Sequence, residues 1–237
     1  QNPDGSATDR SREASVDFLD ACSSALIVDL DNDADQDLVL VTTDRVLFLS
    51  NDGQGLFTIA GAHETDSNLS SVSAADPDRD GDLDVYVCAG RTATGIEDVQ
   101  HFFPLPWHDA NNGHANLYLR NEGDLQFVDA TVESGLDVNN RRWSWAAAWE
   151  DYDNDGDVDL YVANDFGRNN LYRNDDGQFT DVAPESGVED SSAGMGVTWG
   201  DYNNDGRMDL YVSNMFSAAG NRIAYQRRFK TEESEAV

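Results

Sequence analysis

The stretch WEDYDNDGDVDLYV, at residues 149–162, places an aspartate at every second position before it enters an apolar segment. The aspartates are Asp151, Asp153, Asp155, Asp157 and Asp159. Two carboxylates about 5 Å apart repel each other by roughly 3 kcal/mol at an effective dielectric constant near 20. A run of this kind therefore needs a neutralising partner, or it stays extended in water.

The residue types and their order match the needs of a hard divalent cation. Side-chain oxygens at loop positions 1, 3, 5 and 9 and the carbonyl of position 7 can converge on one point, while Gly156 at position 6 permits the tight turn. Ca²⁺ binds about six to eight oxygen ligands, whereas zinc prefers the His and Cys side chains that the stretch lacks, and Mg²⁺ retains more water. The stretch therefore predicts a calcium site.

The same pattern occurs three more times, as DLDNDADQDLVLV from Asp29, DPDRDGDLDVYV from Asp76 and DYNNDGRMDLYV from Asp201. For one match, a solvated acidic turn is a serious alternative, but four matches in register favour metal binding. We expect up to four Ca²⁺ ions, one per loop, with positions 35, 82, 157 and 207 acting through backbone carbonyls. The predicted ligands are Asp29, Asp31, Asp33, Asp35 and Asp37 in the first loop, Asp76, Asp78, Asp80, Asp82 and Asp84 in the second, Asp151, Asp153, Asp155, Asp157 and Asp159 in the third, and Asp201, Asn203, Asp205, Arg207 and Asp209 in the fourth.

The four loops differ in quality. Ala34 stands at position 6 of the first loop, where a positive φ would cost roughly 1 kcal/mol or more for a residue with a Cβ. In the fourth loop, Asn203 offers a neutral oxygen in place of a charged one, and Arg207 occupies position 7. We expect the second and third loops to be the tightest sites and the first to be the poorest.

Short β-type segments flank the loops. Those before the loops are residues 24–28, 145–149 and 195–199, and those after them are 38–41, 85–87, 160–162 and 210–212. They are too short for helices and, after the loops, rich in β-branched and aromatic residues. Position 12 of each loop falls inside the following segment and is not the glutamate of an EF-hand. The metal is therefore expected in a strand–loop–strand hairpin.

Two further strands complete each unit. Third strands are expected at 46–49, 116–119 and 170–173, followed by turns from Asn51, Asn121 and Asn174 and fourth strands from Phe57, Phe127 and Phe179. Four strands in about 45 residues is the signature of a β-propeller blade, so the predicted fold class is all-β. The predicted division is a polar lead-in at 1–21, blades at 22–64, 65–135 (with an insertion at 90–113) and 136–188, and an incomplete fourth blade at 189–237.

Composition narrows the choice of partner. The hydrophobic share of 39% is enough for a core, and the net charge of −31 disfavours nucleic acid or an anionic membrane as a direct partner. No apolar run approaches the length of a membrane span. Cys22 and Cys88 could form one bridge or remain two free thiols.

The insertion could carry a second site. Residues 100–114, QHFFPLPWHDANNGH, contain His101, His108 and His114, whose spacing fits no zinc signature. One interpretation is a metal or catalytic site, which would make the chain a carbohydrate-active lyase or hydrolase; the others are a contact loop for protein or glycan and a loop folded on its own blade. No serine or cysteine triad is visible, so we expect no enzyme.

Other side chains have simpler roles. We expect Trp149 and Trp199 to pack between blades, and Arg141 and Arg142 to be surface charges.

DYDNDGDVDLYV together with LYRNDDGQFTDVAPESGV resembles the FG-GAP/VCBS repeats of integrin α-subunit propellers. Within this group it is most similar to secreted proteins of the cartilage acidic protein (ASPIC/UnbV-associated) type. The resemblance, over about residues 22–226, implies a propeller of about seven blades, Ca²⁺ between the first two strands of a blade, a secreted, periplasmic or cell-surface location, and a role in adhesion through a protein or glycan ligand. The Phe-Gly/Gly-Ala-Pro signature is largely missing. Since only four blades begin here, we expect a piece of a longer propeller, whose open edges invite further blades or another chain.

Overall fold

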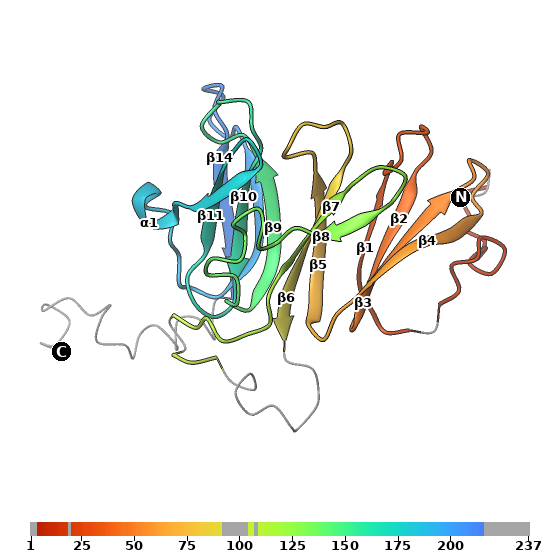
Figure 1. The fold of residues 1–237 in the computed structure, drawn as a ribbon, viewed down its shortest axis with the longest axis horizontal. Helices are drawn as coiled ribbons and strands as arrows, with labels where there is room; N and C mark the ends of the chain where they lie inside the picture. Colours follow the sequence, from red (N-terminus) through yellow and green to blue (C-terminus); the bar gives the residue numbers. More distant parts are fainter. Residues whose placement is uncertain (1–3, 19, 92–103, 107–108, 216–237) are drawn as a thin grey trace, which may run out of the picture.

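The structure of this chain is a computed structural model that describes residues 4–18, 20–91, 104–106 and 109–215. Within these residues, the strands form three four-stranded antiparallel sheets and one two-stranded sheet, which follow one another along the molecule (Figure 1). The predicted all-β fold class is confirmed. The described residues contain no helix long and apolar enough to cross a membrane.

Each sheet is built from strands that are consecutive in the chain. The first contains β1 (Cys22–Val28), β2 (Asp37–Thr42), β3 (Arg45–Asn51) and β4 (Phe57–Glu64). The second contains β5 (Asn68–Ala75), β6 (Asp84–Arg91), β7 (Leu117–Asn121) and β8 (Phe127–Asp129). The third contains β9 (Ser144–Glu150), β10 (Asp159–Asn164), β11 (Asn170–Asp175) and β12 (Gln178–Asp181), and the two-stranded sheet pairs β13 (Gly194–Gly200) with β14 (Asp209–Asn214). The architecture is therefore that of successive propeller blades.

The sheets pack face to face. Because successive side chains of a strand point to opposite faces, the second strand of each sheet contributes side chains to two different cores. In β6, Val85 and Val87 face the first sheet, and Tyr86 and Cys88 face the third. Between the first two sheets, the rings of Phe48 and Phe127 stack with centroids 3.7 Å apart. The first strands β1, β5, β9 and β13 contact one another in that order. This stacking brings the loops that follow these strands to the same end of neighbouring sheets.

The two tryptophans that precede acidic loops pack between sheets, as predicted. Trp149 meets the edge of Tyr86, with ring centroids 6.1 Å apart and an interplanar angle of 87°. Trp199 meets Tyr161 in the same way, at 6.3 Å and 90°. The same aromatic contact therefore joins β6 to β9 and β10 to β13, with nearly the same ring separation from sheet to sheet.

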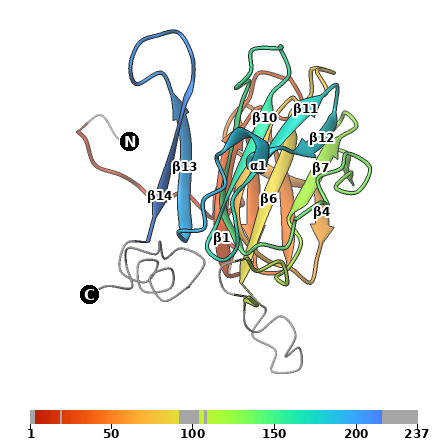
Figure 2. The same cartoon turned by 90° about the vertical axis from the view of Figure 1, so that its left-hand side faces the viewer.

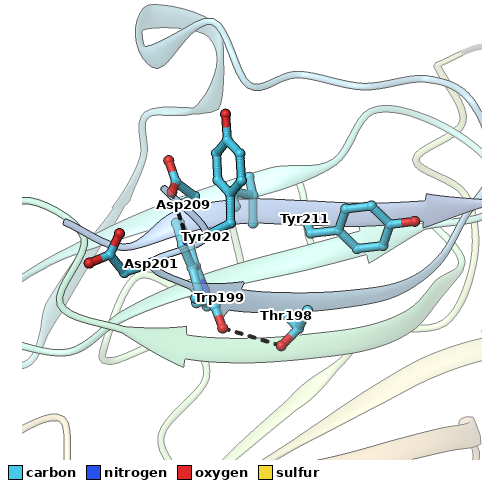
Figure 3. Close-up of a pocket in the computed structure, with 8 residues that line it drawn as sticks. Thr198, Trp199, Asp201, Tyr202, Asp209 and Tyr211 are labelled. Atoms are coloured by element: carbon cyan, nitrogen blue, oxygen red, sulfur yellow. Dashed lines mark hydrogen bonds between the residues drawn. The ribbon is translucent and has the colours of Figure 1, made fainter. Parts of the chain in front are cut away.

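The β13–β14 hairpin presents an open face. Tyr211 corresponds in the repeat to Tyr161 and Tyr86, yet it is 67% exposed, and Tyr202 is 82% exposed. Figure 2 shows the hairpin in blue, with no further strand paired to β14 among the described residues. Both tyrosines line a shallow pocket with Trp199 and Thr198 (Figure 3). The apolar face that the other sheets bury is therefore open here.

Two segments differ from the sequence-based expectation. The sequence does not predict the first strand of the second sheet, β5, because its residues, NLSSVSAA, are rich in serine rather than in apolar side chains. In the structure β5 pairs with β6 along its length, with register shifts only between Asn68 and Ser71. The tail after β12 forms a one-turn helix, α1 (Ala183–Ser186), with Pro184 in its first turn and Gly187 at φ 70° after its end. In β5, therefore, hydrogen bonding to β6 outweighs the weak intrinsic β-propensity of a serine-rich segment.

The expected surface position of Arg142 is wrong. Its side chain is largely buried, pairs with Asp109 at 3.2 Å and donates to the carbonyl of Arg168 at 3.4 Å.

Cys22 and Cys88 are both free, the first exposed and the second buried. Of the predicted insertion site, His101 and His108 lie outside the described residues.

Candidate metal centre

The four acidic loops occupy one place in the repeat, between the first and second strands of each sheet. Among the described residues, three of the loops bring three carboxylate oxygens within 4.8 Å of one another. The groups are Asp29, Asp31 and Asp33; Asp76, Asp78 and Asp80; and Asp151, Asp153 and Asp159. In the fourth loop, all of which is described, no three carboxylates gather in this way, and position 3 is Asn203.

All four loops nevertheless have the same backbone shape. In each, the position 1 carboxylate accepts the N–H of position 6. The bonds run from Ala34 to Asp29 at 3.1 Å, Gly81 to Asp76 at 3.1 Å, Gly156 to Asp151 at 3.0 Å and Gly206 to Asp201 at 2.9 Å. Position 6 has a positive φ throughout, including 73° at Ala34, so the strain expected in the first loop is present.

The ninth-position aspartate is fully buried at Asp37, Asp84 and Asp159. The carboxylate of Asp159 accepts the N–H of Tyr152, at position 2 of its own loop, at 3.1 Å and that of Asn174 at 2.8 Å. Asp37 repeats both bonds. These bonds hold each carboxylate at the base of its loop, at the first residue of the following strand.

At position 1 of the first two loops, one buried carboxylate oxygen lacks a hydrogen-bond donor. Asp29 Oδ1 and Asp76 Oδ1 have no hydrogen-bond partner among the described residues, although the other oxygen of each group binds the loop backbone. A buried polar atom left without a partner costs about 1–3 kcal/mol, and more if it is charged. A cation at the centre of each of the two clusters would satisfy the oxygen of its own loop.

The electrostatics of the loops point to the same kind of ligand. Burial, with a smaller contribution from neighbouring carboxylates, raises the pKa of Asp84 and of Asp159 to about 7. Burial also raises the pKa of Asp31, Asp78 and Asp153, and neighbouring aspartates add to the effect. These sites therefore oppose ionisation of their own ligands, and an all-oxygen, carboxylate-rich donor set suits a hard cation such as Ca²⁺.

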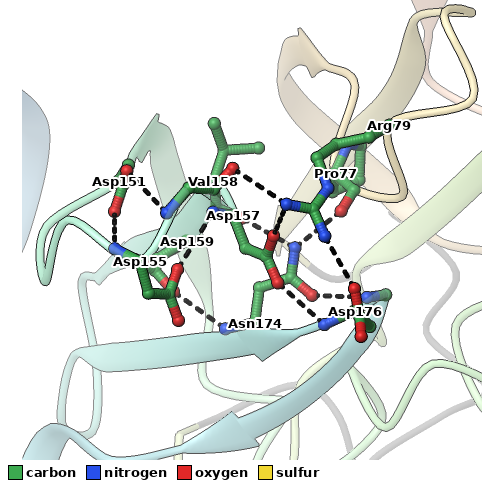
Figure 4. A network of polar contacts seen from close by, with 11 residues as sticks. Pro77, Arg79, Asp151, Asp155, Asp157, Val158, Asp159, Asn174 and Asp176 are labelled. Carbon is green, nitrogen blue, oxygen red and sulfur yellow. Dashed lines mark hydrogen bonds and ion pairs between the residues drawn. The ribbon is translucent and has the colours of Figure 1, made fainter.

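The side chain of position 7 turns to the neighbouring loop. The guanidinium of Arg79, from the second loop, lies 2.6 Å from Asp157 Oδ1, and the N–H of Asp176 donates to Asp157 Oδ2 at 2.9 Å (Figure 4). Likewise, the Asn32 amide donates to Asp82 Oδ1 at 2.8 Å. The side chains of Asp82 and Asp157 are thus engaged elsewhere, in agreement with a ligand role through their carbonyls.

Sequence reasoning missed two kinds of residue at the sites. Asn51, Asn121 and Asn174 look like turn residues, yet each donates its N–H to the ninth-position aspartate of its own sheet. The same residue type at the end of every third strand is a signal that could have identified them. Tyr118, which contacts Asp84, has no such signal because its partner lies 34 residues away.

Comparison with known proteins supports the repeat. Residues 2–87 and 151–212 match the FG-GAP-like repeat, and these two stretches contain all four acidic loops. The comparison with curated proteins found no match. Among solved structures, the chain is similar to the crystal structure of BBS1N in complex with ARL6DN, soaked with lead, at 10% identity and a TM-score of 0.43. That similarity covers 82% of this chain and 51% of the other, so the chain spans about half the length of that relative.

Proposed function

This chain belongs to the FG-GAP-like repeat family, and from that premise we propose that it is a calcium-binding module of stacked β-blades that acts in adhesion by binding a protein or a glycan. The observation that carries the calcium assignment is that a cluster of three carboxylates, always including positions 1 and 3, recurs at one place in three successive sheets. A solvated acidic turn would have no reason to bury a ninth-position aspartate each time.

The role proposed for the metal is structural. Bound Ca²⁺ would link the carboxylates of one loop and cancel their repulsion. Asp29 and Asp76 would each offer Oδ1, the oxygen that has no hydrogen-bond donor, and Asp151 would offer its carboxylate at the same position. The side chains at positions 3, 5 and 9 would complete the set, and position 7 would add its carbonyl. Because these ligands meet only in the folded hairpin, binding and folding are linked.

The location and partners follow from the same proposal. Extracellular modules bind Ca²⁺ with dissociation constants of about 10⁻⁴–10⁻³ M, which suits a secreted, periplasmic or cell-surface protein. The net charge of −31 favours a protein or glycan ligand over nucleic acid. A relationship to the cartilage acidic protein type, a wheel of about seven blades and further blades in the full-length protein remain predictions.

The structural role is tested by thermal unfolding in calcium-free buffer and in 1 mM Ca²⁺, with native mass spectrometry to count the ions. At a dissociation constant of about 0.1 mM, each site would add about 1.4 kcal/mol, so three sites should raise the melting temperature by several degrees. A Mg²⁺ arm at the same concentration is the control, and it should have a smaller effect. An unchanged melting temperature in Ca²⁺ would reject the proposal.

The binding role needs its own test. The purified chain, labelled at the exposed Cys22, is applied to an array of defined glycans and to immobilised extracellular matrix proteins, in Ca²⁺ and in EDTA. Saturable, calcium-dependent binding to one ligand class is expected. Binding that a polyanion of equal charge reproduces would be electrostatic only and would count against a specific site.

A further inference from the structure

Asn174, the penultimate residue of β11, connects two acidic loops. Its N–H donates to Asp159 Oδ1 at 2.8 Å, and its side-chain amide donates to the carbonyl of Val158, in the same loop, at 3.1 Å. The same amide also donates to the carbonyl of Pro77, in the second loop, at 2.7 Å (Figure 4). Asn174 is fully buried, so these bonds form away from water.

Asn121, at the end of β7, repeats the arrangement one sheet earlier. Its N–H donates to Asp84 Oδ1 at 2.8 Å, and its amide donates to the carbonyl of Leu83, in its own loop, at 3.5 Å. The amide also reaches the carbonyl of Leu30, in the first loop, at 3.0 Å. The first loop is thus joined to the second, and the second to the third.

Asn51 shows which bonds this asparagine makes when no earlier sheet supplies a neighbouring loop. In the first sheet it makes the two bonds within its own blade, from its N–H to Asp37 at 2.9 Å and from its amide to the carbonyl of Gln36 at 3.0 Å. No sheet precedes this first sheet in the described part of the chain, so the Asn51 amide has no acidic loop of an earlier sheet to reach. Asn51 is therefore a matched reference for the connection that Asn121 and Asn174 add.

The backbone carbonyls that accept the Asn121 and Asn174 amides across the sheets belong to residues that lie between two predicted calcium ligands. Pro77 stands between Asp76 and Asp78, two members of the second carboxylate cluster. Asn174, which fixes the Pro77 carbonyl, is itself fixed by Asp159, a member of the third cluster. A short path of two hydrogen bonds therefore joins a ligand of the third site to the backbone of the second.

A second contact joins the first loop to the second and the second loop to the third. Position 4 of one loop reaches position 7 of the next, through Asn32 with Asp82 and through Arg79 with Asp157. Arg79 extends this contact to Asp176, at 2.6 Å, in the turn after β11. Two contacts between each pair of neighbours restrict how far one loop can move independently of the next.

We propose that Asn121 and Asn174 are positioning residues that couple calcium binding in adjacent loops. Filling the third site orders Asp159, and through Asn174 it orders the Pro77 backbone, so less conformational entropy remains to be lost when the second site fills. The second site acts on the first through Asn121 in the same way, and by linkage each effect is reciprocal. This inference rests on the proposed calcium function.

The coupling is measured by titrating the full chain with Ca²⁺ in an isothermal calorimeter. All proteins carry D29N, D31N and D201N, which silence the first and fourth loops and leave the second and third. With Asn174 intact, the two ions should bind cooperatively, the second about fivefold more tightly than the first after statistical correction. In the N174A variant the two affinities should become independent, while N51A should keep the cooperativity.

A purely structural role for Asn174 would lower the melting temperature of N174A without removing the cooperativity, and this result would overturn the proposal. Two independent ions in the protein with Asn174 intact would also overturn it, whatever the variants do. If N174A does not fold, a second set of proteins carries D151N, D153N and D201N instead, which leaves the first and second loops intact. N121A is then compared with its parent in this set, and loss of cooperativity is again expected. A chain that binds no Ca²⁺ at millimolar concentration would overturn the proposed function as well, so the two failures are distinguishable.

Discussion

The Tyr118 hydroxyl donates a hydrogen bond to Asp84 Oδ2, where the first and third loops use the backbone N–H of position 2. The reason is local, because position 2 of the second loop is Pro77, which has no N–H. A side chain from β7 thus replaces a backbone donor, and the ninth-position aspartate keeps two donors in each of the first three loops.

This replacement predicts the behaviour of the Y118F variant. Asp84 would lose one of its two donors while fully buried, so the variant should be less stable by about 1–3 kcal/mol and should bind Ca²⁺ more weakly at the second site. Urea unfolding and calcium titration measure the two effects. Y172F is the control, since the Tyr172 hydroxyl donates to the carbonyl of Val138 at 2.7 Å and contacts no acidic loop. Equal calcium affinity in Y118F and the parent would contradict the prediction.

The strained Ala34 predicts a stabilising substitution. Ala34 has a φ of 73°, so the A34G variant should relieve the left-handed strain. After the added flexibility of the unfolded chain is counted, the free energy of unfolding should rise by about 0.5–1 kcal/mol. G81A in the second loop is the matched reverse change. A Cβ on Gly81 would meet no atom within 4 Å, so its cost of about 1 kcal/mol should come from the backbone alone. Urea midpoints that move in the same direction for both variants would argue against this reading.

The raised pKa values predict a pH dependence of the calcium-free protein. Because the pKa of Asp84 and of Asp159 is about 7 in the folded chain, the folded state holds these protons more tightly than the unfolded state does. Their contribution to stability is therefore largest below about pH 4 and is lost as the pH rises towards 7. Melting temperatures from pH 4 to 8 in metal-free buffer should fall across this window, and 1 mM Ca²⁺ should flatten the upper part. A melting temperature that rises with pH in the metal-free protein would speak against it.

The fourth loop predicts a difference in ion count. D151N with D153N should lower the number of bound ions by one, because it removes two of three clustered carboxylates. D201N should leave the count unchanged, because the fourth loop gathers no such cluster. Native mass spectrometry at 1 mM Ca²⁺ makes the comparison, and a loss of one ion in D201N would show that the fourth loop binds.

The two cysteines predict unequal reactivity. Cys22 is exposed, whereas burial raises the pKa of Cys88 to about 12, which leaves almost no thiolate at neutral pH. A thiol reagent should label one cysteine in the native chain and two after denaturation. The C22S variant should then show no fast labelling, and rapid labelling of that variant would contradict the burial of Cys88.

Local pattern was sufficient for the hairpins and for the candidate ligands. Asp at alternate positions and glycine at position 6 are properties of a contiguous segment, so the loop and its donor atoms could be predicted without any distant contact. The apolar segments around the loops marked the second strands, such as β10, for the same reason. Strand β5 was missed, because a serine-rich segment becomes a strand only through pairing with β6.

What the sequence alone determined is the chemistry of each loop: which oxygens it carries, in what order, and how often the unit recurs. What only the tertiary structure decided is how one loop meets the next. Asn174 and Pro77 lie 97 residues apart, and they meet because the sheets stack with their loops at a common end. Such a contact depends on how the first strands pack, and it leaves no periodic trace within either segment. For the same reason, the burial of Arg142 and the donor role of Tyr118 could be read only from the folded chain.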